Sequence, residues 1–322
     1  MIGPVEGGAT VNGVRGLAGC VLVALLLTSG ACADRVVPNP TGSGPVKIGF
    51  ITKFPGDFYG AMVDAVRKYD AAHDDVEVVY GQGKNGTDDE SEIGFIQNMV
   101  GQKVNAIAIT PTSPNVQSAL DKAIATGIKV VLIDNDIPSW SGKSTVVATD
   151  NVAGGRLAGT WLADRLPSGA AVAVLQGRLG NPSLDDRVAG MKATLGDKVE
   201  IVDEVGTDCD RTKGFNATQD ILATHPEVVA IFSACGPPTV GALEAIKDVK
   251  RQARVTLLGF DASTEEIAAI KAGDQAGSIA QFPVRMGTAG VQAAVSAARG
   301  QPLPPKIDTG TEVVTKANVN SF

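Results

Sequence analysis

The chain has few histidines and no cluster of basic residues, and each shortage excludes a class of function. Only two histidines occur among 322 residues, His73 and His225, and they lie far apart in the sequence. A metal site built on histidine is therefore not expected. Lysine and arginine total 28 against 35 acidic residues, which gives a net charge of −7. Because no basic patch is present, we do not expect the protein to bind nucleic acid.

Motifs for catalysis and for cofactor binding are also missing. The sequence has no G-x-S-x-G elbow and no Ser/His/Asp or Cys/His set, so we expect neither an enzyme nor a cofactor. Residues 81–86, "GQGKNG", fit the spacing G-x-G-x-x-G, but Asp88, Asp89 and Glu90 follow at the start of a predicted helix. These acids would repel a pyrophosphate there. We interpret 81–86 as a capped turn, and "SGKS" at 141–144 as a surface turn.

Aromatic residues make up only 4% of the chain. From residue 45 onward, short apolar runs typical of β-strands alternate with amphipathic stretches typical of helices. The predicted strands are 46–52, 76–81, 105–110, 129–134, 170–177, 199–205, 228–234, 255–261 and 276–281. The predicted helices are 57–72, 88–101, 115–126, 151–166, 183–195, 211–224, 237–249, 263–271 and 283–299. Repeated strand–helix units predict an α/β fold made of two doubly wound parallel-sheet lobes. A ligand would then bind at the carboxyl ends of the strands.

An apolar segment near the N-terminus predicts export. Residues 17–28 are too few to span a bilayer as a helix but match the apolar region of a signal peptide, with Arg15 as the positive flank. We therefore predict a signal peptide over residues 1–31.

The residues after this segment resemble the lipobox of bacterial lipoproteins. The sequence "SGAC" ends at Cys32, and a Pro/Gly/Ser-rich tether over 32–44 follows. Cys20 also ends a small-residue run, but it precedes the apolar segment instead of following it. The resemblance implies lipidation of Cys32 and anchoring to a membrane. The alternative is an ordinary signal peptide cleaved near Ala31 or Ala33.

Polar and aromatic residues gather where the predicted strands end. They are Thr52, Phe54, Phe58, Tyr59, Asp134, Asn135, Asp261 and Gln281. A single acid in such a place is commonly only a helix cap. Several acids and amides together with rings are typical of a site for a neutral polyol, because rings stack on the C–H face of a sugar while carboxylates and amides bind its hydroxyls.

Five motifs occur in an order that resembles the periplasmic ribose-type sugar-binding proteins of ABC importers. They are "ATDNVAGGRLAG" (148–159), "AVLQGRLGN…DRVAGMK" (173–192), "DRTKGFNATQDILATHPEVVAIF" (210–232), "LLGFDAST" (257–264) and "GSIAQFPVRMG" (277–287). The resemblance covers about residues 46–314. It implies two lobes joined by three crossovers: an N-lobe of residues 45–149 plus 282–309, and a C-lobe of residues 150–281 plus 310–322.

The resemblance also implies a set of ligand-binding residues. Positions that match or closely replace ligand contacts are Thr52, Phe58, Tyr59, Asp134, Asp261 and Gln281. Asn135 and Asp185 stand where arginines are usual, Cys235 where an asparagine is usual, and Cys209 where an aromatic ring is usual. These departures put ribose itself in doubt, because the guanidinium forks that read a particular sugar are lost. The lysine at position 53 (Lys53) resembles the branch of this family that binds autoinducer-2 or related small sugars.

Two cysteines in the C-lobe suggest a disulfide. If the precursor is cut before Cys32, only Cys209 and Cys235 remain, both just past strands expected to be neighbours in an exported, oxidising setting. The two positions are 26 residues apart, so a bridge would stabilise the fold by roughly 3.5 kcal/mol in the loop-entropy model. The alternative is two free buried thiols that act as small apolar residues.

The sequence as a whole predicts a binding protein. We expect a monomeric lipoprotein on the outer face of the cytoplasmic membrane that captures a sugar or sugar alcohol and delivers it to an ABC transporter permease. One alternative ligand is autoinducer-2 or a related signalling sugar. A different class, the sugar-sensing domain of a LacI-type regulator, shares the fold but needs a helix-turn-helix where this chain has an export signal. An enzyme would have to use Cys209 and Cys235 as a redox pair.

Overall fold

The computed structural model describes residues 3–4 and 44–322. Cys32 lies outside the described residues, as do the predicted signal peptide apart from residues 3–4 and the predicted tether apart from Gly44. Within the described part of the chain, no helix is long and apolar enough to cross a membrane.

The described strands are β1 (Val46–Thr52), β2 (Val76–Gln82), β3 (Ala106–Ile109), β4 (Lys129–Ile133), β5 (Thr145–Ala148), β6 (Ala170–Gln176), β7 (Val199–Gly206), β8 (Ala230–Ser233), β9 (Thr256–Asp261), β10 (Gly277–Ala280), β11 (Lys306–Asp308) and β12 (Glu312–Thr315). They form two six-stranded sheets, with the orders β11-β5-β4-β3-β1-β2 and β12-β10-β9-β8-β6-β7. Neighbours are parallel except β10 and β12, which are antiparallel. The predicted fold class is confirmed.

Helices cover both faces of each sheet. They are α1 (Asp57–Ala71), α2 (Asp89–Gly101), α3 (Gln117–Ala125), α4 (Asn151–Ala163), α5 (Pro182–Leu195), α6 (Arg211–Thr224), α7 (Gly236–Asp248), α8 (Thr264–Ala272) and α9 (Pro283–Ala298). On the first sheet, α1 and α9 lie on one face and α2 and α3 on the other; on the second, α4 and α5 lie opposite α6 and α7. Asp88 begins α2 by accepting a hydrogen bond from the Ser91 N–H at 3.1 Å, as expected for a capping acid.

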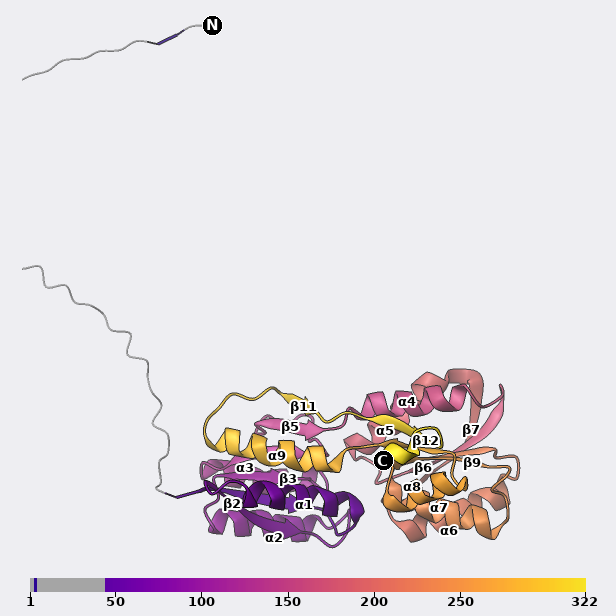
Figure 1. Ribbon diagram of the computed structural model, residues 1–322, viewed down its shortest axis with the longest axis horizontal. Coiled ribbons are helices and arrows are strands. Elements are labelled where there is room, and N and C mark those ends of the chain that lie inside the picture. The colour runs from indigo at the N-terminus through magenta and orange to yellow at the C-terminus, as the bar shows by residue number, and fades with distance from the viewer. Residues whose placement is uncertain (1–2, 5–43) are drawn as a thin grey trace, which may run out of the picture. The chain divides into compact units, whose positions relative to one another are not determined.

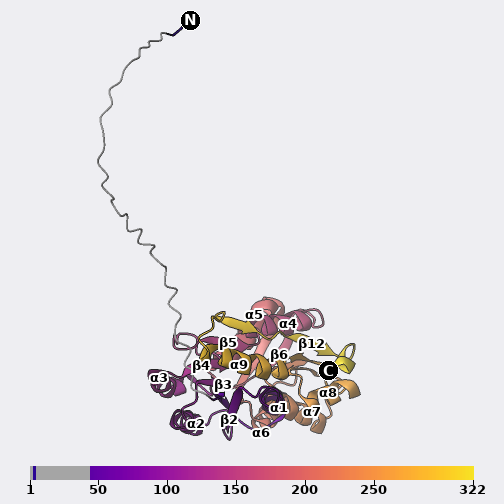
Figure 2. The same cartoon turned by 60° about the vertical axis from the view of Figure 1, so that its left-hand side comes forward.

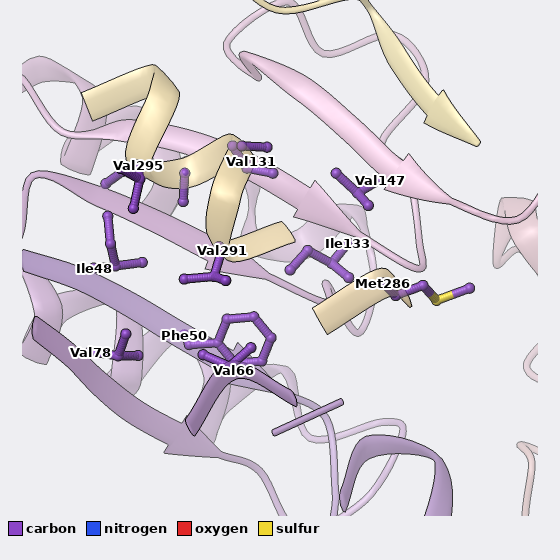
Figure 3. Close-up of a cluster of buried hydrophobic side chains, with 14 of the residues drawn as sticks. Ile48, Phe50, Val66, Val78, Val131, Ile133, Val147, Met286, Val291 and Val295 are labelled. Carbon is purple, nitrogen blue, oxygen red and sulfur yellow. The ribbon is translucent and has the colours of Figure 1, made fainter. Parts of the chain in front are cut away.

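The period-2 pattern of the strands sorts their side chains between two apolar cores per sheet. Ile48 and Phe50 of β1 enter the core beneath α1 and α9, whereas Ile51 enters the core beneath α2 and α3. Figure 3 shows Val291 of α9 lying near Phe50 of β1, and Met286 of the same helix lying near Ile133 of β4. The central strands β3, β6 and β8 are buried along their whole length, so the middle of each sheet lies between two helix layers, whereas β7 and β11 at the edges are partly exposed.

The chain passes between the two sheets three times. It crosses between β5 and α4, between β10 and α9, and between β11 and β12. As a result α9, which follows the second sheet in sequence, packs on the first, and Figures 1 and 2 show it beside α1. The chain ends beside α8, to which its last turn is packed. The residue boundaries predicted for the two lobes stay a prediction.

The prediction missed three strands and one strand direction. β5, β11 and β12 contain only three or four residues each. β11 and β12 both lie at sheet edges. Each adds a strand from the C-terminal part of the chain to a sheet formed earlier in the sequence.

Candidate functional site

A cavity of about 430 Å³ lies where segments after the strands of both sheets meet. Its volume is in the range of small-molecule sites. Nine of the residues predicted from the sequence line it: Lys53, Phe54, Phe58, Tyr59, Asp134, Asn135, Cys235, Asp261 and Gln281. The strand-end argument therefore brings together residues from β1, β4, β8, β9 and β10.

Two predicted ligand contacts, Thr52 and Asp185, do not line the cavity. The Thr52 hydroxyl is buried and accepts a hydrogen bond from Gln82 Nε2 at 3.1 Å, because Thr52 is still within β1 and pairs with the end of β2. Asp185, in the first turn of α5, accepts a hydrogen bond from Gln176 Nε2 at 2.6 Å. Thr52 thus joins the ends of β1 and β2, and Asp185 joins the first turn of α5 to the end of β6.

Three rings from the N-lobe form an aromatic wall. Tyr59 contacts Phe54 and Phe58 edge to face, with ring centroids 4.9 Å and 5.1 Å apart. The rings come from the segment after β1 and from the first turn of α1. Burial, together with the neighbouring Asp134 carboxylate, raises the pKa of Tyr59 well above its usual value. The phenol therefore remains a hydrogen-bond donor.

Asp134 is the acid that the N-lobe contributes at the end of β4. It accepts hydrogen bonds from Tyr59 Oη at 3.1 Å and from Asn135 Nδ2 at 2.5 Å. Burial raises the pKa of this carboxyl, whereas Lys53 and Arg187 oppose the rise. Burial lowers the pKa of Lys53 in turn, against the attraction of Asp134 and Glu92. The N-lobe side of the cavity thus holds the buried Lys53 and the buried Asp134, whose mutual attraction opposes the effect of burial on each pKa.

Asp261 is the matching acid of the C-lobe, at the end of β9. Its carboxylate accepts hydrogen bonds from the Gly236 N–H at 2.8 Å and from Gln281 Nε2 at 2.7 Å. Arg187 Nη1 lies 3.5 Å from its Oδ1. Gln281 itself lines the cavity, and its Oε1 is buried without a hydrogen-bond partner among the described residues.

The structure contains a disulfide between Cys209 and Cys235, with their Cα atoms 6.0 Å apart, and both residues line the cavity. The predicted reason for the bridge is wrong, however, because β7 and β8 are not neighbours: β6 lies between them. The bridge therefore crosses over the end of β6, at Gly177. Its formation in the exported protein stays a prediction, which mass spectrometry of non-reduced peptides would test.

Sequence reasoning missed the arginines of the cavity. Arg178 and Arg187 both line it, so guanidinium groups are present although the two expected positions hold Asn135 and Asp185. Arg187 is buried, donates to Asn151 Oδ1 and to the Ala234 carbonyl at 2.9 Å each, and stacks over the Phe260 ring. The signal was available for Arg178, which comes two residues after β6 ends.

The cavity combines acceptors, donors and an apolar wall. Carboxylates come from both lobes, an ammonium and two guanidiniums act as donors, and the rings lie on the N-lobe side. Among residues 44–322, no group of His, Cys, Asp and Glu side chains is arranged to hold a metal ion. Such a set of groups can bind the hydroxyls of a compact polar molecule and stack on its C–H face.

Comparison with known proteins gives consistent matches. A family model described as a periplasmic binding protein domain matches residues 48–302. The chain is 29% identical over 297 residues to the ribose import binding protein of Bacillus subtilis, covering 90% of this chain and 95% of that protein. An ABC transporter solute-binding protein structure from Mycobacterium smegmatis with bound glycerol is 30% identical, with a TM-score of 0.80 and coverage of 86% and 96%. One from Burkholderia graminis in complex with D-arabinose is 27% identical, with a TM-score of 0.80 and coverage of 88% and 99%.

Proposed function

Since this chain belongs to the family of periplasmic binding protein domains, we propose that it is an extracytoplasmic binding protein that captures a sugar or sugar alcohol between its two lobes. The observation that carries the proposal is the cavity itself, which has one carboxylate from each lobe, Asp134 and Asp261, and a wall of rings. A small ligand that bonds to both acids would hold the lobes together. Relatives described as ribose, D-arabinose and glycerol binders support a polyhydroxyl ligand.

The same proposal gives the protein a partner and a place. It is a monomer that performs no chemistry and delivers its ligand to an ABC transporter permease, which recognises the lobes closed over the ligand. The described helices include none that crosses a membrane, and we propose that a lipid on Cys32 holds the protein at the outer face of the cytoplasmic membrane. Labelling with a fatty-acid analogue should be lost in Cys32→Ser and retained in Cys20→Ser. Label that follows Cys20 instead would refute this anchor.

A ligand screen tests the binding function. Pentoses, hexoses and alditols are added at the same low millimolar concentration, and thermal unfolding of the protein without its signal peptide is followed. A true ligand at a hundred times its Kd stabilises the folded state by about 2.7 kcal/mol. The equal concentrations control for the general stabilising effect of sugars as co-solvents. If every compound gives the same small shift, the sugar-binding proposal is wrong.

Lys53 supports a second candidate ligand for the same cavity. Its ammonium group is buried at the cavity beside Asp134, and its position resembles that in proteins for autoinducer-2 or related small signalling sugars. Adding such a compound to the screen distinguishes the two ligands. Lys53→Met should weaken binding of the signalling sugar most if the ammonium group is its main contact.

A further inference from the structure

Arg178 reaches from the C-lobe to the N-lobe. It follows β6, and its Nη1 lies 3.2 Å from Asp89 Oδ1, 3.3 Å from the Gly86 carbonyl oxygen and 3.3 Å from the Thr112 carbonyl oxygen. All three acceptors belong to the N-lobe: Gly86 lies between β2 and α2, Asp89 is the first residue of α2, and Thr112 follows β3. Arg178 also lines the cavity, so these contacts close one side of the candidate site.

Asp89 is held in place to receive this contact. It is the first residue of α2 and accepts hydrogen bonds from Asn115 Nδ2 at 2.7 Å and from Ser113 Oγ at 2.9 Å. Burial would raise the pKa of Asp89, but the hydrogen bonds from Thr112, Asn115, Arg178 and Ser113 lower it to about 2. The carboxylate is therefore ionised throughout the physiological range, and it sits where a helix N-terminus favours negative charge.

The C-lobe side of this contact is also braced. Gly177, next to Arg178, lies against the disulfide, since a Cβ on Gly177 would be 2.9 Å from Cys209 Sγ. Five residues beyond Arg178, the Ser183 hydroxyl donates to the main-chain carbonyl of Asp134 at 3.1 Å, which is a second bond between the lobes. Within the C-lobe, the Arg178 carbonyl oxygen accepts a hydrogen bond from the Asn181 N–H at 3.2 Å, so Arg178 projects from a short turn that is held at both Gly177 and Asn181.

We propose that Arg178 is a latch residue that holds the two lobes together over the bound ligand, an inference that rests on the proposed sugar-binding function. The three acceptors lie on one lobe and the donor on the other, so every one of these bonds breaks when the lobes separate. The latch stabilises only the closed arrangement. Its loss must therefore appear as faster dissociation of ligand, with little change in association, because encounter occurs with the open cleft.

Matched variants separate the latch from ordinary structural effects. Arg178→Met and Arg178→Lys have side chains of similar length and differ in the charged nitrogen; because one nitrogen makes all three contacts, the lysine variant should retain part of the effect. Arg251→Met is the control, since Arg251 Nη2 donates to the Pro226 and Val228 carbonyls within the C-lobe alone. It removes a similar set of bonds without touching the cleft.

Two measurements decide the proposal. Stopped-flow binding of the best sugar from the screen should give a dissociation rate about tenfold higher in Arg178→Met, an intermediate rate in Arg178→Lys, and association rates within about twofold, as expected for one charge-assisted bond network. Spin labels on unnatural residues at exposed Lys122 of α3 and Asp220 of α6 report the distance between the lobes in ligand-free protein. There Arg178→Met should lose the fraction with the shortest distances.

The outcomes separate the latch from the binding function. If no sugar or alditol binds the wild-type protein, the proposed function fails, and the ligand-free distance distribution still decides the latch. An unchanged distribution in Arg178→Met overturns it. So does a dissociation rate that rises equally in Arg178→Met and Arg251→Met, because that result would indicate general destabilisation of the C-lobe.

Discussion

Asp261 connects three parts of the C-lobe side of the cavity, through the Gly236 N–H, Gln281 and Arg187. We expect Asp261→Asn to weaken sugar binding by more than about tenfold, because a hydrogen bond from a hydroxyl to a carboxylate is worth about 1.5–3 kcal/mol. Calorimetry of the folded protein measures the change. Asp185→Asn is the control and should leave affinity within about twofold, since Asp185 does not line the cavity. Unchanged affinity in Asp261→Asn would make this acid a structural residue.

Glu266 is a buried acid of α8 that should make the stability of the protein depend on pH. It is fully buried and accepts hydrogen bonds from Gln275 Nε2 at 3.0 Å and Ser278 Oγ at 2.8 Å. Burial, reinforced by the Asp261 carboxylate, raises the pKa of Glu266 from 4.5 to about 8. The folded state therefore keeps a proton that the unfolded chain releases above pH 4.5. Its contribution is full below that pH and is lost as pH rises through about 8.

Glu266→Gln removes this titration and should flatten the dependence of stability on pH. Relative to wild type, the free energy of unfolding of the variant should rise with pH between 5 and 8, by at most about 1.4 kcal/mol per pH unit. Urea unfolding at several pH values measures it. Glu265→Gln, its exposed neighbour on α8, should keep the wild-type slope. A wild-type slope in Glu266→Gln would show that Glu266 is ionised in the folded state.

At the scale of single residues, the sequence predicted which acids and which glutamine line the cavity better than it predicted the arginines there. Asp134, Asp261 and Gln281 were predictable because parallel strands present their carboxyl ends to a shared site. Arg187 was not, because it lies inside α5, and its value to the site depends on Asn151, Ala234 and Asp261, which come from three distant segments. Such a convergence is a property of the packed structure.

At the scale of elements, the disulfide between Cys209 and Cys235 passes over the end of β6 at Gly177. It can do so because Gly177 has no side chain. A Cβ at Gly177 would lie 2.4 Å from Leu184 Cδ1 and 2.9 Å from Cys209 Sγ. We therefore expect Gly177→Ala to destabilise the fold by about 1–3 kcal/mol through overpacking. Gly94→Ala is the control. Gly94 is a solvent-exposed residue away from the ends of α2, and nothing lies within 4 Å of its ideal Cβ.

The control should change stability in the opposite direction, because alanine replaces glycine in a helix with a gain of about 0.5–1 kcal/mol. Denaturant unfolding of the two variants gives both values. If Gly177→Ala is as stable as wild type, the loop after β6 can shift to make room for the methyl group, and the disulfide does not require glycine at position 177.

Elements with a long periodic pattern were predictable, and those defined by their neighbours were not. The helices lie within a few residues of their predicted bounds because each presents an apolar face to a sheet. The sequence around β11 has no such signal, since "KID" becomes a strand only by pairing with β5. The same reason explains the error at the disulfide, because strand order in a doubly wound sheet does not follow chain order.

Across the whole molecule, the three crossovers tie the folding of the two lobes together. α9 follows the C-lobe strands in sequence yet completes the core of the first sheet, as Figure 3 shows, and β11 and β12 then add one strand to each sheet. The lobes therefore depend on one continuous C-terminal segment. A ligand bound to both lobes would couple them a second time, through the cavity.

The two tryptophans report the lobes separately and test where the ligand binds. Trp140 lies in the core beneath α2 and α3, and Trp161 lies in the core beneath α4 and α5. In Trp161→Phe and Trp140→Phe, the remaining tryptophan follows unfolding of the N-lobe and the C-lobe respectively. A ligand that needs both lobes folded stabilises only the state in which neither has opened. Saturating sugar should therefore raise the midpoint of the less stable lobe until the two denaturant transitions coincide. If sugar moves one transition and leaves the other separate at saturation, the binding site lies within a single lobe.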